Sequence, residues 1–187
     1  IDYTLSETPL RAAELFAIHP FGKMPVLRHG DLTLFESKAI ATYLDGAFPG
    51  PRLIPTEPRP AALLEQWVSF VNTAVDRTVI RTYLYAYIAP KTADGSPDRA
   101  TIAAVLPELR QQVAVLDKAV AATGHLVCTE LTFADLNLLP LLHRLGQAPE
   151  GAEALAGAMH LSAYYARHAA RPSFQRTMPP PGPPASH

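Results

Sequence analysis

The spacing of apolar positions changes near residue 48 and divides the chain into two predicted parts. In the first part, short apolar alternations predict strands, and apolar residues three or four positions apart predict helices. The predicted elements are strands over 1–5, 24–28 and 32–35 and helices over 10–18 and 36–44. The last two strands are joined by His29-Gly30-Asp31, so we expect them to form an antiparallel hairpin.

Residues 48–60 contain six prolines and glycines, which predicts a stiff linker between two domains. Beyond the linker the apolar spacing is helical throughout. Helices are predicted over 61–88, from a Ser96 cap to Gly124, over 132–145, and near 150–157 and 160–170. Pro107 is expected to kink or split the second of these helices.

These elements predict an α+β protein of two domains. The first is a small α/β domain over 1–47 and the second is an all-α domain over 61–176, separated by the linker 48–60. A proline-rich tail over 177–187 is expected to be disordered. A hydrophobic content of 48% with 18% charged residues is ordinary for a globular protein, so disorder of the whole chain is excluded.

Charge and cysteine content narrow the classes of function. The 187 residues carry a formal net charge of −1, which argues against binding to nucleic acid or to an anionic membrane surface. No uncharged apolar run approaches the roughly 18 residues of a membrane span. Cys128 is the single cysteine, so an internal disulfide and a CxxC pair are both excluded. We expect a buried thiol and a cytoplasmic protein.

Met24 and Pro25 form the first candidate site. A cis bond between them would turn the N–H and C=O groups of Met24 toward a bound peptide, as in strand addition. A trans proline that opens an ordinary strand explains the same two residues, because only about 5% of X–Pro bonds are cis.

Glu36 and Ser37 form the second candidate site, at a predicted strand-to-helix junction. Ser37 and the first-turn N–H groups suit an anion, and Glu36 suits an ammonium, so the pair fits the head group of an amino acid. An ordinary helix cap explains the same residues. One hairpin separates this pair from Met24, and Lys23 and Arg11 add positive charge. The implied ligand is a small peptide with two carboxylates.

Three further features are less specific for a function. Tyr83 and Tyr87 lie one helical turn apart, and they either line an apolar co-substrate pocket or pack in the core or a dimer interface. Thr132 and Asp135 are spaced as a capping box, which is a structural role. The histidines show no metal-ligand spacing, so no metal is predicted.

The order of these motifs resembles that of cytosolic glutathione transferases over about residues 1–176, most closely the phi-like and theta-like branch of bacteria and plants. The resemblance rests on PFGKMPVL, LFESKAIATYL, LTFADLNLLPLL and Arg171-Pro172-Ser173. It implies a thioredoxin-like N-terminal domain, an all-α C-terminal domain and glutathione as co-substrate. It also implies a homodimer with its clefts at the domain interfaces.

The resemblance further implies a role for each residue of the two candidate sites. The backbone of Met24, beside a cis Pro25, would bind glutathione, Glu36 and Ser37 would hold its γ-glutamyl group, and Lys23 with Arg11 would hold its glycyl carboxylate.

The sequence departs from the family at three places. The family usually has asparagine where His19 stands and glycine where Cys128 stands. It also begins with a strand and a helix, about 30 residues, that would precede Ile1. That segment carries the serine, tyrosine or cysteine that donates to the glutathione sulfur and stabilises its thiolate. We therefore expect the catalytic residue upstream of Ile1.

The leading hypothesis is a transferase that adds the glutathione thiolate to small hydrophobic electrophiles. A second hypothesis is a non-catalytic binding or interaction module on the same fold. A third keeps the fold and changes the reaction to peroxide reduction, isomerisation or dehalogenation. The pocket residues that select the co-substrate occupy variable helical positions, so the sequence does not separate these reactions.

Overall fold

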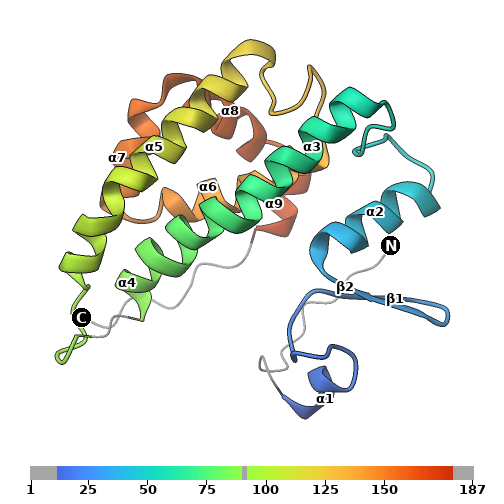
Figure 1. Cartoon of the computed structure of the whole chain (residues 1–187), viewed down its shortest axis with the longest axis horizontal. Coiled ribbons are helices and arrows are strands. Elements are labelled where there is room, and N and C mark those ends of the chain that lie inside the picture. Colours follow the sequence, from blue (N-terminus) through green and yellow to red (C-terminus); the bar gives the residue numbers. More distant parts are fainter. Residues whose placement is uncertain (1–11, 90–91, 179–187) are drawn as a thin grey trace. The chain divides into compact units, whose positions relative to one another are not determined.

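A computed structural model describes residues 12–89 and 92–178. The chain divides into two compact units, Ile1–Ile54 and Pro55–His187, and the division falls inside the predicted linker. Among the described residues, strands occur only in the first unit (Figure 1). The α+β class with an all-helical second part is thus confirmed.

A β-hairpin between two helices forms the described part of the first unit. Its elements are α1 (Ala13–Phe16), β1 (Val26–His29), β2 (Leu32–Phe35) and α2 (Ser37–Ala47). The strands are antiparallel, with Val26 opposite Phe35. Gly30 has a φ of 62° in the turn, a conformation that glycine adopts without a steric cost. The predicted hairpin is confirmed, whereas the strand predicted over 1–5 lies outside the described residues.

Several bounds in the first unit differ from the prediction. β1 begins at Val26, because Pro25 has no N–H with which to pair as a strand residue. α1 begins only at Ala13, since Ala12 has an extended backbone. α2 continues beyond residue 44 and ends where Phe48 becomes extended.

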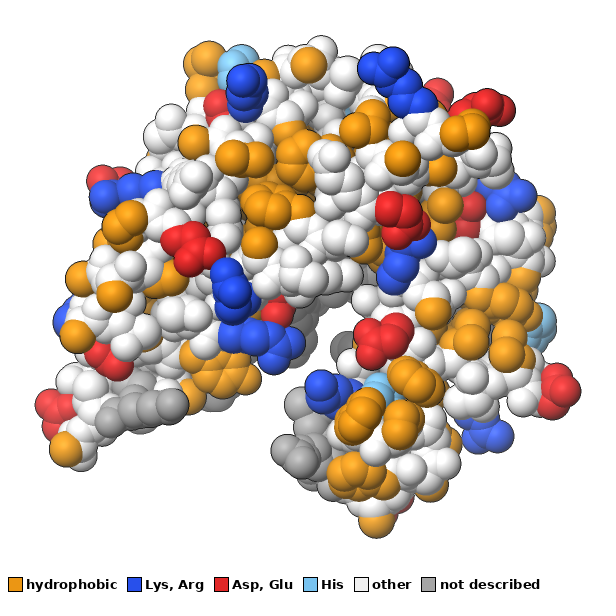
Figure 2. All heavy atoms as spheres, in the orientation of Figure 1, with side chains coloured by type: hydrophobic (Ala, Val, Ile, Leu, Met, Phe, Trp, Pro, Cys, Tyr) orange, Lys and Arg blue, Asp and Glu red, His pale blue; other side chains and the backbone are white. Residues whose placement is uncertain are grey.

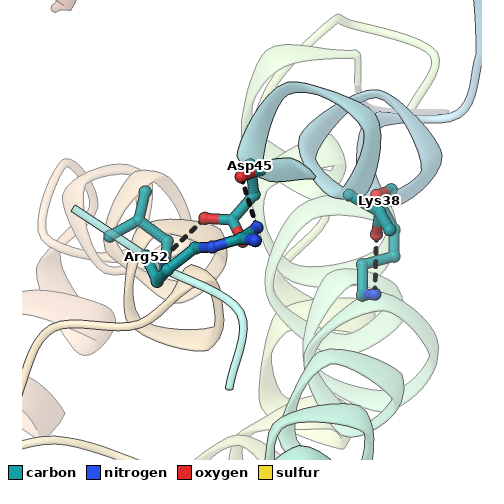
Figure 3. A network of polar contacts seen from close by, with 5 residues as sticks. Lys38, Asp45 and Arg52 are labelled. Carbon is teal, nitrogen blue, oxygen red and sulfur yellow. Dashed lines mark hydrogen bonds and ion pairs between the residues drawn. The ribbon is translucent and has the colours of Figure 1, made fainter. Parts of the chain in front are cut away.

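Asp45, in the last turn of α2, fixes the segment that follows the helix. Its carboxylate accepts from the N–H of Leu53 at 2.6 Å and from the Arg52 guanidinium at 3.2 Å. Arg52 also donates to the Asp45 carbonyl oxygen at 2.6 Å. Figure 3 shows Arg52 reaching to Asp45, with Lys38 at the other end of the same helix. Specific hydrogen bonds therefore order this part of the predicted linker.

Helices alone make up the described part of the second unit. They are α3 (Pro58–Phe70), η1 (Val71–Leu84), α4 (Tyr85–Ile88), α5 (Arg99–Thr123), α6 (Phe133–Leu145), α7 (Pro149–Gly157), α8 (Met159–Ala169) and α9 (Pro172–Thr177). α5 packs against α8 and η1, and α6 packs against η1 and α3 (Figure 1). The packed faces bury a leucine-rich core that includes Leu64, Leu109, Leu116, Leu138, Leu142 and Leu161.

The helix predicted over 61–88 is continuous, but its central part, η1, is π-helical. At its end the backbone N–H of Tyr85 donates to the carbonyl of Ile80, five residues earlier. Hydrogen bonds of this spacing define a π-helix. Apolar spacing indicated a helix without distinguishing the two types, since both place apolar residues on one side.

Two prolines correct the predicted helix bounds. Pro58 lies within the predicted linker but begins α3, because a residue in the first turn needs no partner for its backbone N–H. Pro107 does not split α5, which is continuous through it. Val105 and Leu109, two positions before and after Pro107, are buried in the core, so packing of this helix continues on both sides of the proline.

The predicted cap of α5 is also corrected. Asp98, not Ser96, caps the helix and accepts from the N–H of Thr101 at 3.0 Å. The Ser96 hydroxyl instead donates to Asp94 at 2.7 Å. Gly124, with a φ of 78°, ends the helix as predicted.

The capping box predicted for Thr132 and Asp135 is present at the start of α6. The Asp135 carboxylate accepts from the Thr132 N–H at 2.8 Å. Cys128, expected to be buried, is only half-buried, and its thiol lies 3.6 Å from the Glu130 carbonyl oxygen. Within residues 12–89 and 92–178, no helix is both long and apolar enough to cross a membrane.

Candidate functional site

The hairpin register brings the two candidate sites to one end of the hairpin. Val26 pairs with Phe35, so Pro25, which precedes β1, and Glu36, which follows β2, lie at the same end of the hairpin. The Met24–Pro25 bond is cis, as the resemblance implied. Two motifs that are eleven positions apart in the sequence, Met24-Pro25 and Glu36-Ser37, are thereby neighbours in the fold.

Glu36 has an unusual backbone at the junction of β2 and α2. Its φ of 71° and ψ of 117° lie where residues other than glycine are uncommon and strained. Glu36 occupies the cap position of α2 without forming a side-chain capping bond, and Ser37 is the first helical residue. Both side chains are exposed. The junction therefore presents a carboxylate and a hydroxyl beside the positive end of a helix dipole.

Lys23 and Met24 are the remaining described residues predicted to contact a ligand, since Arg11 lies outside the described residues. Both are exposed, and the Lys23 ammonium lies 5.9 Å from the centre of the Phe21 ring. Hydrophobic side chains gather on the same unit (Figure 2). The exposed large hydrophobic residues of this unit include Phe21 at 63% exposure, Met24 at 44% and Phe35 at 39%. The end of the hairpin thus combines exposed charged and apolar groups.

His19 orders the turn that leads into this segment, a role that the sequence analysis missed. Its side chain is 3% exposed, and its Nδ1 accepts from the N–H of Phe21 at 3.0 Å. Its carbonyl accepts from the N–H of Gly22 at 2.9 Å. The ring lies 4.9 Å from that of Phe35, measured between centres. The available signal was its place two residues before Phe21, the spacing of a side-chain-capped turn.

Tyr83 and Tyr87 belong to the second unit, where both contact Glu150 of α7. Tyr83 is fully buried, which fits the core-packing alternative. Its hydroxyl donates to Glu150 at 2.9 Å and accepts from the N–H of Gly151 at 2.8 Å. Tyr87 is half-buried, and its hydroxyl donates to the same Glu150 at 2.5 Å. Both tyrosines therefore connect their own helices to α7 through Glu150.

The described residues contain no group of three or more His, Cys, Asp or Glu side chains placed to hold a metal ion. The groups at this end of the hairpin match those of a charged peptide in chemical character. Ser37 and the α2 N–H groups can receive a carboxylate, Glu36 can accept from an ammonium, and the backbone of Met24 can pair with that of an extended ligand.

Two family models match the chain. The glutathione S-transferase N-terminal domain matches residues 1–46, and the glutathione S-transferase C-terminal domain matches residues 75–172. Glutathione S-transferase 3 of Zea mays is 32% identical over 92% of this chain and 79% of its own. The stringent starvation protein A homolog of Haemophilus ducreyi is 27% identical over 88% of this chain and 72% of its own.

A solved structure has the same fold. Glutathione S-transferase I bound with the ligand lactoylglutathione has a TM-score of 0.77 at 26% identity, and the match covers 89% of this chain and 78% of that one. The fold is therefore that of proteins with a thioredoxin-like N-terminal domain and a helical C-terminal domain. The chain belongs to the glutathione S-transferase family.

Proposed function

We propose that the protein binds glutathione at the end of the hairpin and transfers its thiolate to a small hydrophobic electrophile. The observation that carries the proposal is the register that makes Met24-Pro25 and Glu36-Ser37 neighbours. Glutathione carries an ammonium and two carboxylates on a peptide backbone, and this chemistry matches the groups at that end.

In the proposed complex, Glu36 accepts from the γ-glutamyl ammonium, and Ser37 with the first N–H groups of α2 holds the adjacent carboxylate. Met24 pairs through its backbone beside Pro25, and Lys23, together with Arg11, holds the glycyl carboxylate. Binding in this way fixes the position of the sulfur, so the contribution of these residues to transfer is orientation. We also propose that the protein is a cytoplasmic homodimer, which is supported by its membership of the family.

Calorimetric titration of the full chain with glutathione tests the binding proposal. Glu36→Gln and Ser37→Ala are each expected to weaken binding about tenfold or more, because each removes a charge-assisted hydrogen bond. Thr33→Ala is the matched control, since Thr33 is exposed on β2 away from the junction and should leave affinity unchanged. Unchanged affinity in both site variants would refute the assignment.

A second candidate function is a non-catalytic glutathione-binding or interaction module. It is favoured by the similarity to stringent starvation protein A homologs, whose name does not denote a transferase. Glutathione conjugation of an aromatic halide separates the two candidates. Turnover that is lost in Glu36→Gln supports the transferase, whereas tight glutathione binding without conjugation of any halide tested supports the module.

A further inference from the structure

We propose that Phe21 is a positioning residue, whose aromatic ring holds the Lys23 ammonium where it meets the glycyl carboxylate of glutathione. The inference rests on the proposed function, in which Lys23 binds that carboxylate. Phe21 acts through Lys23, since a phenylalanine side chain has no polar group of its own to offer the ligand.

The contact between these two side chains carries the inference. The Lys23 Nζ lies over the Phe21 ring, 5.9 Å from its centre. A cation within about 6 Å of an aromatic ring centre is attracted by the negative face of the ring. Among the residues that the structure describes, the Lys23 ammonium has no ion-pair partner. The ring is therefore the described group that restrains the ammonium before a ligand arrives.

Hydrogen bonds fix the backbone that carries the ring. The N–H of Phe21 donates to His19 Nδ1 at 3.0 Å, and the N–H of Gly22 donates to the His19 carbonyl at 2.9 Å. Gly22, between Phe21 and Lys23, has a φ of 58°, a conformation that favours glycine. The ring is thus attached to an ordered turn, and the flexible lysine side chain is the partner that it holds.

Holding the ammonium in advance should raise the affinity for a carboxylate. A free lysine side chain has many rotamers, and confining it when a ligand binds costs conformational entropy. Because the ring already confines the ammonium, part of this cost is absent from the binding step. An ammonium has three N–H donors, so it can meet the ring on one side and a carboxylate on another. The gain should therefore appear only for ligands that carry the glycyl carboxylate.

The exposure of Phe21 makes its role separable from folding. The side chain is 63% exposed, so its replacement removes little core packing and its variants should fold. Phe21→Leu keeps an apolar side chain without an aromatic face, and Phe21→Trp supplies the ring that attracts cations best. Phe16→Leu is the matched control, since Phe16 lies on α1 of the same unit and is 47% exposed.

The test is calorimetric titration of the full chain with two probes, S-methylglutathione and its glycyl amide, in which a neutral amide replaces the glycyl carboxylate. Phe21→Leu should bind S-methylglutathione about two- to fivefold more weakly than wild type, which corresponds to one exposed cation–ring contact. Phe21→Trp should bind it at least as tightly as wild type, and Phe16→Leu should match wild type. Wild type and both Phe21 variants should bind the amide with nearly equal affinity. Equal weakening of both probes in Phe21→Leu would overturn the proposal, because Phe21 would then act on the whole site.

Lys23→Gln removes the ammonium and provides the second readout. In that background Phe21→Leu should leave the affinity for S-methylglutathione unchanged, because the ring has no cation to hold. A loss as large as in the wild-type background would refute the positioning role and would show that Phe21 contacts the ligand or another protein molecule directly. Wild type that binds neither probe would refute the proposed function itself. Wild type that binds S-methylglutathione no more tightly than Phe21→Leu does would refute the positioning role alone.

Discussion

The hydroxyl of Tyr83, on η1, caps the first turn of α7 by accepting from the N–H of Gly151 at 2.8 Å while it donates to Glu150 at 2.9 Å. Glu150 also accepts from the Tyr87 hydroxyl, and this bond is the largest cause that lowers the pKa of its carboxyl. Burial raises the pKa of Tyr83, so its hydroxyl stays protonated and able to donate. One buried hydroxyl thus connects η1 to α7, through two residues that lie 67 and 68 positions further along the chain.

Tyr83→Phe should lower the free energy of unfolding by about 1–3 kcal/mol, because it leaves the buried Gly151 N–H without an acceptor. Urea denaturation measures the loss. Tyr85→Phe is the matched control, since Tyr85 is adjacent and 50% exposed, and it should change stability by less than about 0.5 kcal/mol. Equal effects of the two substitutions would contradict the capping role of Tyr83.

Gly151 should be intolerant of any side chain. A methyl group there would collide with the carbonyl oxygen of Leu145 and lie 3.1 Å from the Tyr83 ring. Gly151→Ala is therefore expected to destabilise the protein by about 3 kcal/mol in thermal or urea unfolding. Gly157, the last residue of α7, has no atom within 4 Å of such a methyl group, so Gly157→Ala should be neutral or slightly stabilising. Equal losses would refute the steric argument.

Local signals explain which parts of the fold were predictable. The hairpin was evident because Gly30 sits between two short alternating segments. The start of α5 was misplaced because Ser96 and Asp98 are both good caps, and their order of use depends on Asp94, which occupies the Ser96 hydroxyl. Sequence spacing alone does not rank two caps two residues apart.

The long-range pairings were not predictable in the same way. The spacing of Tyr83 and Tyr87 placed both on one helix face, but their shared partner, Glu150, lies in another helix. The candidate site was more accessible to prediction, because Met24-Pro25 and Glu36-Ser37 flank a single hairpin and its register brings them together. His19 was missed because its acceptor role appears only once the turn geometry is known.

Asp135 should contribute more to stability than an ordinary helix cap. It is fully buried, and besides the Thr132 N–H it accepts from the Thr132 hydroxyl at 3.0 Å, the Leu126 N–H at 2.9 Å and the Tyr164 hydroxyl at 3.1 Å. Asp135→Ala leaves these buried donors without an acceptor. We therefore expect the free energy of unfolding to fall by about 3–5 kcal/mol, more than the roughly 0.5–2 kcal/mol of a simple cap.

Asp98→Ala is the comparison for Asp135→Ala, since Asp98 caps α5 through bonds to Thr101 in the first turn of its own helix. Urea denaturation of both variants should show a clearly smaller loss for Asp98→Ala. Similar losses would mean that the buried bonds of Asp135 to Leu126 and Tyr164 add little to its capping role.

His168 on α8 sits in surroundings that oppose its protonation. Its side chain is 2% exposed, and its ring centre lies 5.2 Å from that of His125 and 4.7 Å from that of Tyr164. Burial, followed by the charge of Arg167 and by His125, lowers the pKa of His168 to about 4, and Asp135 only partly offsets them. The Arg167 guanidinium lies 3.3 Å from His168 Nε2. The folded protein therefore keeps this imidazole neutral.

The consequence is a loss of stability in mild acid. The ordinary histidine pKa near 6.5 applies to the unfolded chain, so between pH 6.5 and pH 4 the unfolded state takes up a proton that the folded state does not. The contribution of His168 is fully present above pH 6.5, falls as the pH drops and is lost below about pH 4, a change of about 3 kcal/mol. In urea denaturation across pH 4–8, His168→Phe should show a shallower loss than wild type, while His160→Gln, exposed on the same helix, should follow wild type. Parallel curves for wild type and His168→Phe would show that the acid sensitivity arises elsewhere.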